Sequence, residues 1–533
     1  MTPPPDAFPL TEAQLGIWYA QLRDPQSPVF VTGQAFWIDG PLDAEAIVRA
    51  VDRLGAEADA LSLRVAETPE GARQWLDPEG APRLVLRDAP EDLEAAIRAE
   101  ARQPLDLAAG PIAGFTLWRI APERFVLTER IHHIAADGQA MVQVTRRLAA
   151  LYAEEMGGEA GDPLSPFARS LEDDARFASA PARDRQQAWW RDRLSGLGEI
   201  EHAGGQGSGD GRWFHRAEQA LPDAIGAALA ALADRAGVHW TDALTALSGA
   251  FLARHMPRIA TGEGDEIVLG IPLQNRMGKV ARIVSTQVNV LPLRLVLDED
   301  AALADWIAAV GADLAALRRN GRYRGEALAR ETGRIGAGRR LWGPLINILP
   351  FDACPDLPRC RTRLQILGAG SVDDLTVCFR GDPAQGLLAQ VDANDALYEH
   401  DHTRTLCHRL VAFLDAALDA ERLADVPTLT PQETAEHVGA RNATARDIPR
   451  TTLAALIEAQ MAAQPDATAL VFGQTRLSYG ALEARSGALA RRLAARGIGP
   501  GDIVGVALPR SVEMMIALVA VLRCGAEPVG RAA

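Results

Sequence analysis

The sequence predicts a mixed α/β protein with more than one domain. The chain has 533 residues, and a single hydrophobic core stops growing at about 250–300 residues. Apolar residues recur with the two-residue period of strands in some segments and with helical spacing in others, and the two kinds of segment alternate. The alternation is interrupted near residue 430 and then resumes. We therefore expect a large α/β region followed by a smaller one.

The composition excludes several classes of protein. Apolar residues make up 48% of the chain and charged residues 23%, as in globular proteins, so a fibrous or disordered chain is excluded. The net charge of −15 argues against a nucleic-acid-binding protein, because such proteins need cationic contacts to phosphate. Lys279 is the only lysine, so it is the only candidate for chemistry that requires one.

The N-terminus and the cysteines favour a cytoplasmic protein without a membrane anchor. The N-terminus lacks the basic and apolar regions of a secretory signal, and the longest strongly apolar run, Met514–Leu522, is too short for a bilayer span. The five cysteines form no Cys-x-x-Cys pair, which favours buried thiols in a reducing compartment over disulfides or a zinc site.

Several strands and amphipathic helices are expected in the first region. A glycine-rich loop is expected at Ala203–Gly211, because glycine loses much entropy inside a regular element. It follows a helix at Trp189–Arg193, near the start of a second lobe. The expected strands are Val29–Ile38, Leu61–Val65, Arg124–Ile131, Ile267–Ile271 and the extended stretch Thr286–Leu297, and the expected helices are Asp43–Gly55, Glu91–Arg102 and Asp242–Arg254.

A polar, proline-containing stretch predicts a linker over residues 433–450. Beyond it, Leu482, Leu489 and Leu493 share one helical face, and Gly497 is placed to end that helix. A strand at Ile503–Leu508 and a helix at Val512–Arg523 follow. These residues, 451–533, are fewer than a typical domain has, so we expect them to be the opening of a larger one.

Two adjacent histidines, His132 and His133, end the predicted strand Arg124–Ile131. Their rings are expected on opposite faces, with His133 on the more apolar one. A helical pattern that includes Met141 and Tyr152 follows, so the pair lies between a strand end and a helix N-terminus. Catalytic groups are common at such a position, because rigid elements hold the loop on both sides.

Three interpretations of this segment compete. A zinc site is disfavoured, because neighbours on opposite faces cannot chelate one ion. In a purely structural interpretation, Asp137 caps the helix and the histidines are ordinary, partly buried residues. In the functional interpretation, a neutral imidazole accepts a proton near pH 7 and Asp137 fixes the loop.

The motif His132-His133-x-x-x-Asp137-Gly138 resembles that of nonribosomal peptide synthetase condensation domains and their chloramphenicol-acetyltransferase-like relatives. Further similar segments occur in the family's order over about residues 8–432, and Ser285 stands where the family has a glycine. The tail resembles the first two core motifs of an adenylation domain, and the whole pattern is similar to siderophore synthetases such as the enterobactin system. The similar segments are Leu10–Tyr19, Ser285–Leu293 with Asn289, Tyr323, Gly343–Phe351, Leu477–Leu482 and Leu522–Ala526.

This resemblance implies an architecture and a reaction. Two chloramphenicol-acetyltransferase-like lobes, residues 8–180 and 181–432, would form a V with a tunnel between them. No cofactor would bind directly, since substrates arrive as 4′-phosphopantetheine thioesters on carrier proteins. A donor acyl or aryl carrier protein would act in trans, and an acceptor peptidyl carrier protein would present the amine that forms the amide. Neither nucleic acid nor membrane would be a partner.

The resemblance also implies roles for particular residues. His133 would accept the amine proton or hold the amine, with His132 beside it, Asp137 fixing the loop, and Gly138 assisting an oxyanion. Ser62 stands where the family has an arginine that pairs with the motif aspartate, and Arg64 is expected to replace that charge. The residues expected to line the tunnel are Asn289, Ser62, Arg64 and Tyr323.

The segment Arg318–Arg340 carries eight arginines against Glu326 and Glu331. Arg318 and Arg319 could contact an acidic carrier protein or the pantetheine phosphate, and a solvated basic face is the alternative. The tail contains no glycine-rich phosphate loop and no C-terminal lysine, and Lys279 lies in the wrong region to replace it. Adenylation activity is therefore not expected from this chain.

Other members of the superfamily remain as alternatives. A catalytically silent condensation-like module would recruit carrier proteins or tailoring enzymes, and the absence of an arginine at Ser62 slightly favours it. An epimerase carries the same histidine motif but is expected after a carrier domain, whereas an adenylation start follows here. A heterocyclase is disfavoured, because both motif histidines are present.

Overall fold

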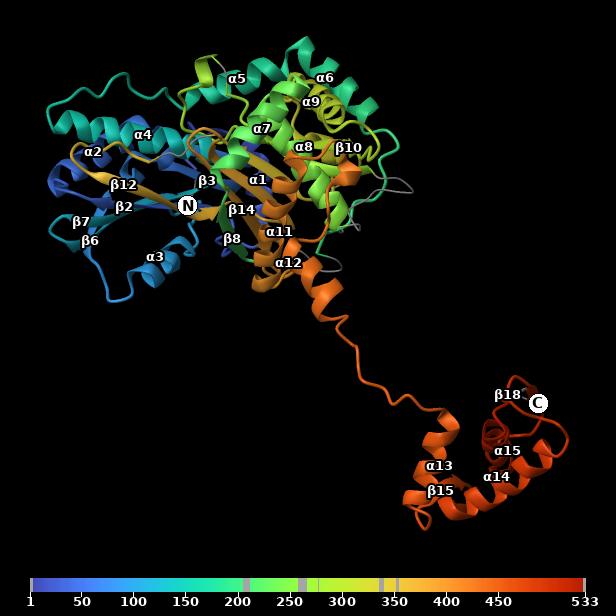
Figure 1. Ribbon diagram of the computed structural model, residues 1–533. Helices are drawn as coiled ribbons and strands as arrows, with labels where there is room; N and C mark the ends of the chain where they lie inside the picture. Colours follow the sequence, from blue (N-terminus) through green and yellow to red (C-terminus); the bar gives the residue numbers. More distant parts are fainter. Residues whose placement is uncertain are drawn as a thin grey trace. The chain divides into compact units, whose positions relative to one another are not determined.

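The computed structural model describes residues 3–204, 211–256, 266–276, 278–334, 340–350 and 354–530. The described residues do not include most of the loop expected at Ala203–Gly211, nor Arg339 and Phe351. Of Lys279 only the side chain is left out. The chain forms two compact units, Met1–Thr434 and Ala435–Ala533 (Figure 1). No helix in the described parts of the chain is long and apolar enough to cross a bilayer.

A five-stranded sheet forms the first lobe, with the strand order β12-β2-β7-β6-β5. Helices α2 and α4 cover one face and α3 lies on the other (Figure 1). Asp43 and Asp137 cap the N-termini of α2 and α4 with their side chains. The elements are β2 (Val31–Asp39), β5 (Leu84–Asp88), β6 (Ala113–Ala121), β7 (Arg124–His132), β12 (Arg361–Ala369), α2 (Ala44–Glu57), α3 (Leu93–Ala101) and α4 (Gly138–Glu155).

A small three-stranded sheet, in the order β1-β4-β3, belongs to the same lobe. The strand predicted at Leu61–Val65 begins at Leu63, because Asp59–Ser62 form a 3-10 turn before it. Trp18 and Leu63 join this sheet to the core beneath α2 and α4. The elements are β1 (Phe8–Pro9), β3 (Leu63–Thr68), β4 (Gly71–Leu76) and α1 (Glu12–Arg23).

A six-stranded sheet forms the second lobe, with the order β10-β9-β11-β13-β14-β8. Helices α7, α8, α9 and α11 share one continuous apolar core with it. The strands are β8 (Phe214–Ala220), β9 (Glu266–Leu273), β10 (Asn289–Val296), β11 (Leu345–Leu349), β13 (Leu375–Asp382) and β14 (Gly386–Asn394). Helix α5 (Ala168–Ala178) precedes this lobe. The helices that follow are α6 (Pro181–Arg193), α7 (Asp223–Ala236), α8 (Trp240–His255), α9 (Leu303–Arg319), α10 (Gly325–Glu331), α11 (His400–Leu418) and α12 (Pro431–Thr434).

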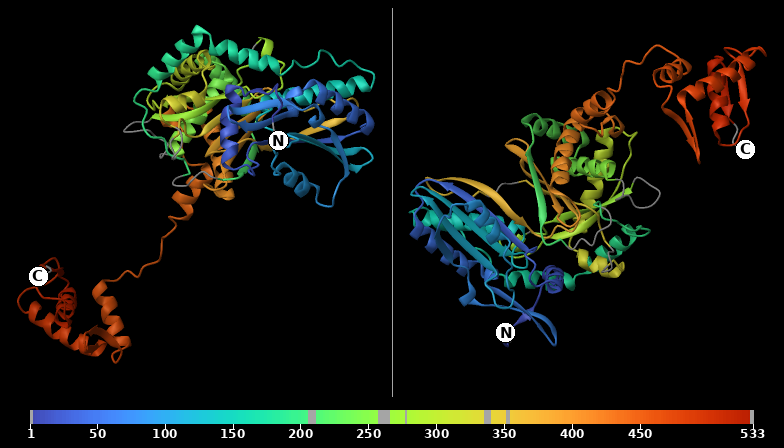
Figure 2. Two further views of the ribbon diagram at one scale, coloured as in Figure 1. Left: turned by 180° about the vertical axis from the view of Figure 1, so that it is seen from behind. Right: turned by 90° about the horizontal axis from the view of Figure 1, so that it is seen from below.

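Strand β12 does not follow the predicted division of the lobes at residue 181. It comes from Arg361–Ala369, yet it pairs antiparallel with β2 at the edge of the first lobe's sheet. The second views show this strand beside those of the N-terminal region (Figure 2). Pairing satisfies the backbone groups along the edge of β2, which would otherwise be open. The prediction that residues 181–432 all lie in the second lobe is therefore wrong for this strand.

The second unit has a small core and leaves several large apolar side chains exposed. Its core consists of a few residues, including Met461, Leu482 and Ile516, whereas Phe472 and Ile503 are exposed. The elements are a π-helical turn (Ala435–Ala440), α13 (Leu453–Ala463), β15 (Thr468–Phe472), β16 (Thr475–Ser478), α14 (Tyr479–Ala494), β17 (Ile503–Val506), α15 (Val512–Arg523) and β18 (Glu527–Gly530).

Candidate active site

His133 lies immediately after β7 and borders a cavity that both lobes line. Its backbone N–H donates to the carbonyl of Phe30 at 2.7 Å, which fixes the strand end. Its ring Nδ1 lies 3.3 Å from the hydroxyl of Thr286, and that hydroxyl donates to the His133 carbonyl. The Thr286 oxygen can then only accept from Nδ1–H, so neutral His133 carries its proton on Nδ1 and has a free lone pair on Nε2.

The protonation of His133 is disfavoured. Burial lowers the pKa of its imidazole, and the nearby Asp137 carboxylate only partly opposes this effect. Gly370 packs closely against the ring, and a Cβ atom added at this position would lie only 2.8 Å from His133 Cδ2. The ring is therefore neutral near pH 7 and held from two sides.

His132 points away from the cavity. Its side chain is 1% exposed, the N–H of Ile134 donates to Nδ1 at 3.1 Å, and Nε2 lies 3.1 Å from Gln21 Oε1. Burial, with the neighbouring His133, lowers its pKa to about 3. The predicted catalytic position of His132 is therefore not supported by its location, and its contacts are those of a structural residue.

Asp137 connects the helix cap to the second lobe. One carboxylate oxygen caps α4 through the N–H of Ala140 at 2.9 Å and lies 2.7 Å from Arg276. The other accepts from the N–H groups of Gln287 and Val288. Burial opposes ionisation, but Arg276 and these N–H groups hold the pKa of Asp137 below its usual value.

The prediction that Arg64 pairs with Asp137 is wrong. Arg64 lies on β3, in the small sheet, and its guanidinium is 3.0 Å from Asp77. It fills the space beside Gly110, where an added Cβ would lie 2.1 Å from Arg64 Cζ. Arg276, which sequence reasoning missed, supplies the charge from the second lobe instead.

The other residues expected in the tunnel also lie outside the cavity lining. Ser62 donates to the carbonyl of Asp59. Asn289 is buried and donates to the carbonyls of Gly321 and Tyr323, so it holds the loop before α10. Tyr323 is 1% exposed and its hydroxyl donates to Glu331. None of these residues forms the surface of the cavity, and Asn289 supports its wall by holding the loop that carries the lining residue Arg324.

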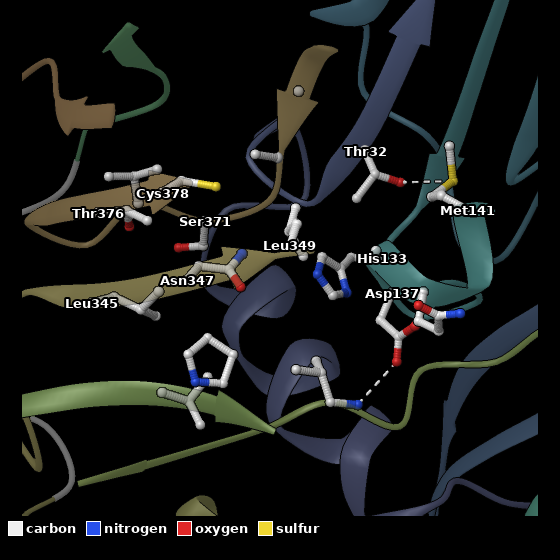
Figure 3. Close-up of a pocket in the computed structure, with 18 of the residues that line it drawn as sticks. Thr32, His133, Asp137, Met141, Leu345, Asn347, Leu349, Ser371, Thr376 and Cys378 are labelled. Carbon is white, nitrogen blue, oxygen red and sulfur yellow. Dashed lines mark hydrogen bonds between the residues drawn. The ribbon is translucent and has the colours of Figure 1, made fainter. Parts of the chain in front are cut away.

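The cavity has a volume of about 390 Å³ and receives side chains from both lobes. Figure 3 shows Thr32 and Met141 on one side of His133, and Ser371 and Cys378 on the other. Gly138, the first residue of α4, also borders it, and a Cβ added there would meet only open space. This volume suits a small-molecule ligand or part of an extended one.

The wall formed by the second lobe includes several polar side chains, among them Gln390 and Asp392. Arg216 forms a two-point ion pair with Asp392, and Gln390 donates to the same carboxylate at 2.8 Å. Cys378 lies opposite Gln390 in the sheet, and burial raises the pKa of its thiol to about 12. The thiol is therefore protonated near neutral pH. No group of three or more potential metal ligands occurs among the described residues.

Most of the described arginines in Arg318–Arg340 contact other parts of the first unit. Arg318 pairs with Asp242, Arg322 with Asp173 at 2.6 Å, and Arg334 donates to the carbonyl of Leu197. Arg319, at the end of α9, is exposed. The segment is therefore less available to a partner than its charge predicts.

The fold and the site together define a class of protein, the two-lobed chloramphenicol-acetyltransferase-like enzymes. A family model described as "Condensation domain" matches residues 5–436, and one described as "AMP-binding enzyme" matches residues 457–532. The chain belongs to the condensation-domain family of nonribosomal peptide synthetases, and a short AMP-binding segment follows. The predicted family resemblance and the predicted fold class are confirmed.

Similar proteins agree with this assignment. The chain is 30% identical over 531 residues to a dimodular nonribosomal peptide synthase of Bacillus subtilis, covering 97% of this chain and 22% of the relative. It is 30% identical over 540 residues to enterobactin synthase component F of Escherichia coli O157:H7, covering 97% of this chain and 41% of the relative. The chain thus spans less than half the length of these relatives.

Two solved structures share the fold. The first condensation domain of the calcium-dependent antibiotic synthetase, in complex with a substrate analogue, matches with a TM-score of 0.71 and 26% identity, covering 80% of this chain and 100% of that one. VibH, a nonribosomal peptide synthetase condensation enzyme, matches with a TM-score of 0.66 and 25% identity, covering 79% of this chain and 100% of that one.

Proposed function

We propose that this chain catalyses amide-bond formation between a donor acyl or aryl thioester and an acceptor aminoacyl thioester, both held on carrier proteins by 4′-phosphopantetheine. The observation that carries the proposal is the neutral His133 ring, whose Nε2 lone pair is left free beside a cavity lined by both lobes. Membership of the condensation-domain family and the similar solved structures support it.

The reaction forms one C–N bond, breaks one C–S bond and moves one proton from nitrogen to sulfur. The acceptor amine nitrogen attacks the donor thioester carbonyl, the C–N bond forms, and collapse of the tetrahedral intermediate breaks the C–S bond. The amine loses a proton, and the departing sulfur leaves as the thiol of the donor pantetheine. His133 Nε2 would take the amine proton, or hold the amine through a hydrogen bond, and the proton then reaches the thiolate.

A strong base is not required for this step. A free α-amine has a pKa of about 7.7–8.0, so part of it is already neutral near pH 7. Because burial lowers the pKa of His133, we assign more weight to orientation of the amine than to proton removal. The first N–H groups of α4, including that of Gly138, would stabilise the negative oxygen of the intermediate.

We also propose domain boundaries, carrier-protein partners and a location for this chain. We assign condensation to residues 1–432, with lobes at 8–180 and 181–432 apart from β12. A linker follows at 433–450, and an adenylation-like segment follows at 451–533, to which we assign no adenylation activity. A donor carrier in trans and an acceptor peptidyl carrier would dock on the first unit, with exposed Arg319 as the remaining candidate contact from the basic segment. A cytoplasmic location is likewise a prediction.

A single-turnover assay tests the proposal. The full chain is mixed with an acyl-loaded donor carrier and an aminoacyl-loaded acceptor carrier, and the amide product on the acceptor is followed by mass spectrometry. We expect product with the wild type and a loss of about a hundredfold or more with His133→Ala. Carrier binding without product in the wild type, across several acyl and aminoacyl groups, would instead favour the silent recruiting module.

A further inference from the structure

The first-lobe end of the cavity contains a buried amide, that of Gln34. This residue lies on β2, is 4% exposed and borders the cavity. It faces Glu129 across the β2–β7 pair, and α4 covers both residues through Thr145. None of these three side chains has a part in the reaction described above.

The orientation of this amide is fixed by its neighbours. Gln34 Nε2 donates to Glu129 Oε2 and to Thr145 Oγ1, each at 2.7 Å. The Thr145 hydroxyl directs its own hydrogen to Glu129 Oε2 at 3.2 Å, so its oxygen can only accept from Gln34. Both hydrogens of Nε2 are therefore used, and Oε1 is the free end of the amide.

No described residue donates a hydrogen bond to Gln34 Oε1. Gln34 Oε1 is not one of the fully buried side-chain atoms that lack a partner, so this oxygen keeps accessible surface, and water or a ligand is its partner. Because Gln34 borders the cavity, a molecule in the cavity can supply that partner. The partner must be a donor, since Oε1 can only accept.

The path from His133 to this acceptor is mainly apolar. His133 bonds to Phe30, and Gln34 is four residues further along β2, about 13 Å at the rise of an extended strand. Met141 lies beside Thr32 (Figure 3), and Met141 and Val142 both line the cavity. Thr32 lies there too, but its hydroxyl is already donated to the carbonyl of Ile131 at 2.8 Å.

We propose that this end of the cavity binds the far end of a carrier-bound acyl chain that terminates in a hydroxyl or N–H group, with Gln34 Oε1 as the acceptor. The inference rests on the proposed function, because it assumes that an acyl group is delivered to His133. An anionic terminus does not fit, since it would bring a second acceptor to an oxygen that can only accept. A purely aliphatic terminus would leave Oε1 without a partner.

Equilibrium binding of soluble probes tests this proposal. The probes are straight-chain acyl-pantetheines of increasing length, each made with and without a terminal hydroxyl, and their affinity for the full chain is measured by calorimetry. At one or two chain lengths we expect the hydroxylated probe to bind the wild type roughly three- to tenfold more tightly than its partner, the effect of one neutral hydrogen bond. No preference at any length would overturn the proposal.

Variants locate the effect at Gln34. In Gln34→Leu the preference for the hydroxylated probe should disappear, whereas in Gln365→Leu it should persist, because Gln365 lies on β12 outside the cavity lining and accepts from Trp37. A preference that persists in Gln34→Leu would overturn the assignment. If that variant does not fold, the same binding test is made with Thr145→Val. Loss of the Thr145 hydroxyl frees the Gln34 amide to rotate, so the preference for the hydroxylated probe should be reduced.

The result of this binding test does not depend on whether the chain forms amide bonds. Binding is measured without turnover, so a hydroxyl preference that depends on Gln34 would stand even if no amide were formed. Amide formation without any hydroxyl preference would leave the proposed function intact and refute only this inference.

Discussion

The carboxylate of Asp137 and the guanidinium of Arg276 lie 2.7 Å apart, although 139 residues separate them in the chain. Both side chains are 3% exposed. Asp137 begins the helix that follows His133, whereas Arg276 comes from the second lobe. This buried ion pair, together with the N–H groups of Gln287 and Val288, therefore fixes the loop after His133 relative to the opposite wall of the cavity.

Removal of Arg276 should strongly destabilise the first unit. In Arg276→Met the Asp137 carboxylate stays buried without its counter-charge, and we expect the free energy of unfolding to fall by about 3–5 kcal/mol. Urea unfolding followed by tryptophan fluorescence measures this. Arg282→Met is the matched control, because Arg282 pairs with Asp162 on the surface and should cost less than about 1 kcal/mol. Equal losses in the two variants would contradict this account of the pair.

Thr286 should set the tautomer of His133. In Thr286→Val the acceptor of Nδ1–H is lost, and we expect the rate of condensation to fall by up to about a hundredfold, while Thr286→Ser keeps most of it. Nitrogen NMR of ¹⁵N-histidine-labelled protein, with His133→Gln for assignment, reports the protonated nitrogen directly. A wild-type His133 protonated on Nε2 would refute the assignment whatever the rates.

Gly370 should be required for the position of the His133 ring. Its φ is +91°, and Gly157 has nearly the same φ, +92°, with no atom within 4 Å of an added Cβ. Alanine at either position should cost about 1–3 kcal/mol of stability through backbone strain. Only Gly370→Ala should also lose condensation activity, because its Cβ would displace the ring. Thermal unfolding and single-turnover rates separate the two effects.

Glu129 should give the protein a specific pH dependence. Burial raises its pKa from 4.5 to about 7, so between these pH values the folded chain binds more protons than the unfolded chain. The stability that this group contributes is thus present below pH 4.5 and is lost as the pH rises through 7.

Glu129→Gln removes this titration. The stability of the variant relative to the wild type should therefore increase between pH 4.5 and 7, by about 3 kcal/mol in total. Urea unfolding across that range measures the difference. A constant difference between the two proteins would show that Glu129 titrates near its ordinary pKa.

The local part of the site was predictable from the sequence. His133, Asp137 and Gly138 are close in the chain, and the strand-to-helix pattern around them places them together at the cavity. Arg276 and Thr286 were not predictable, because they approach His133 from more than a hundred residues away. Only the packing of the two lobes brings them there, and no periodicity in the sequence specifies it.

The predicted positions of Arg64 and Asn289 were wrong for a similar physical reason. Arg64 has a suitable charge and strand position, but it belongs to the small sheet, where Asp77 is the nearer carboxylate. Asn289 occupies a polar position in a motif segment, yet its amide is used by the backbone of the Gly321–Tyr323 loop. A side chain's chemistry can be recognised in a sequence, whereas the partner that uses it depends on the tertiary structure.

The pairing of β12 with β2 has a consequence for how the protein is made. The first lobe's sheet obtains its last strand from Arg361–Ala369, so during synthesis the edge of β2 stays unpaired until the ribosome has passed residue 369. An open edge of this kind is a site for pairing with other chains. A nascent chain stalled before residue 361 should therefore bind chaperones and aggregate more readily than one stalled after residue 434, even though the earlier strands are already complete.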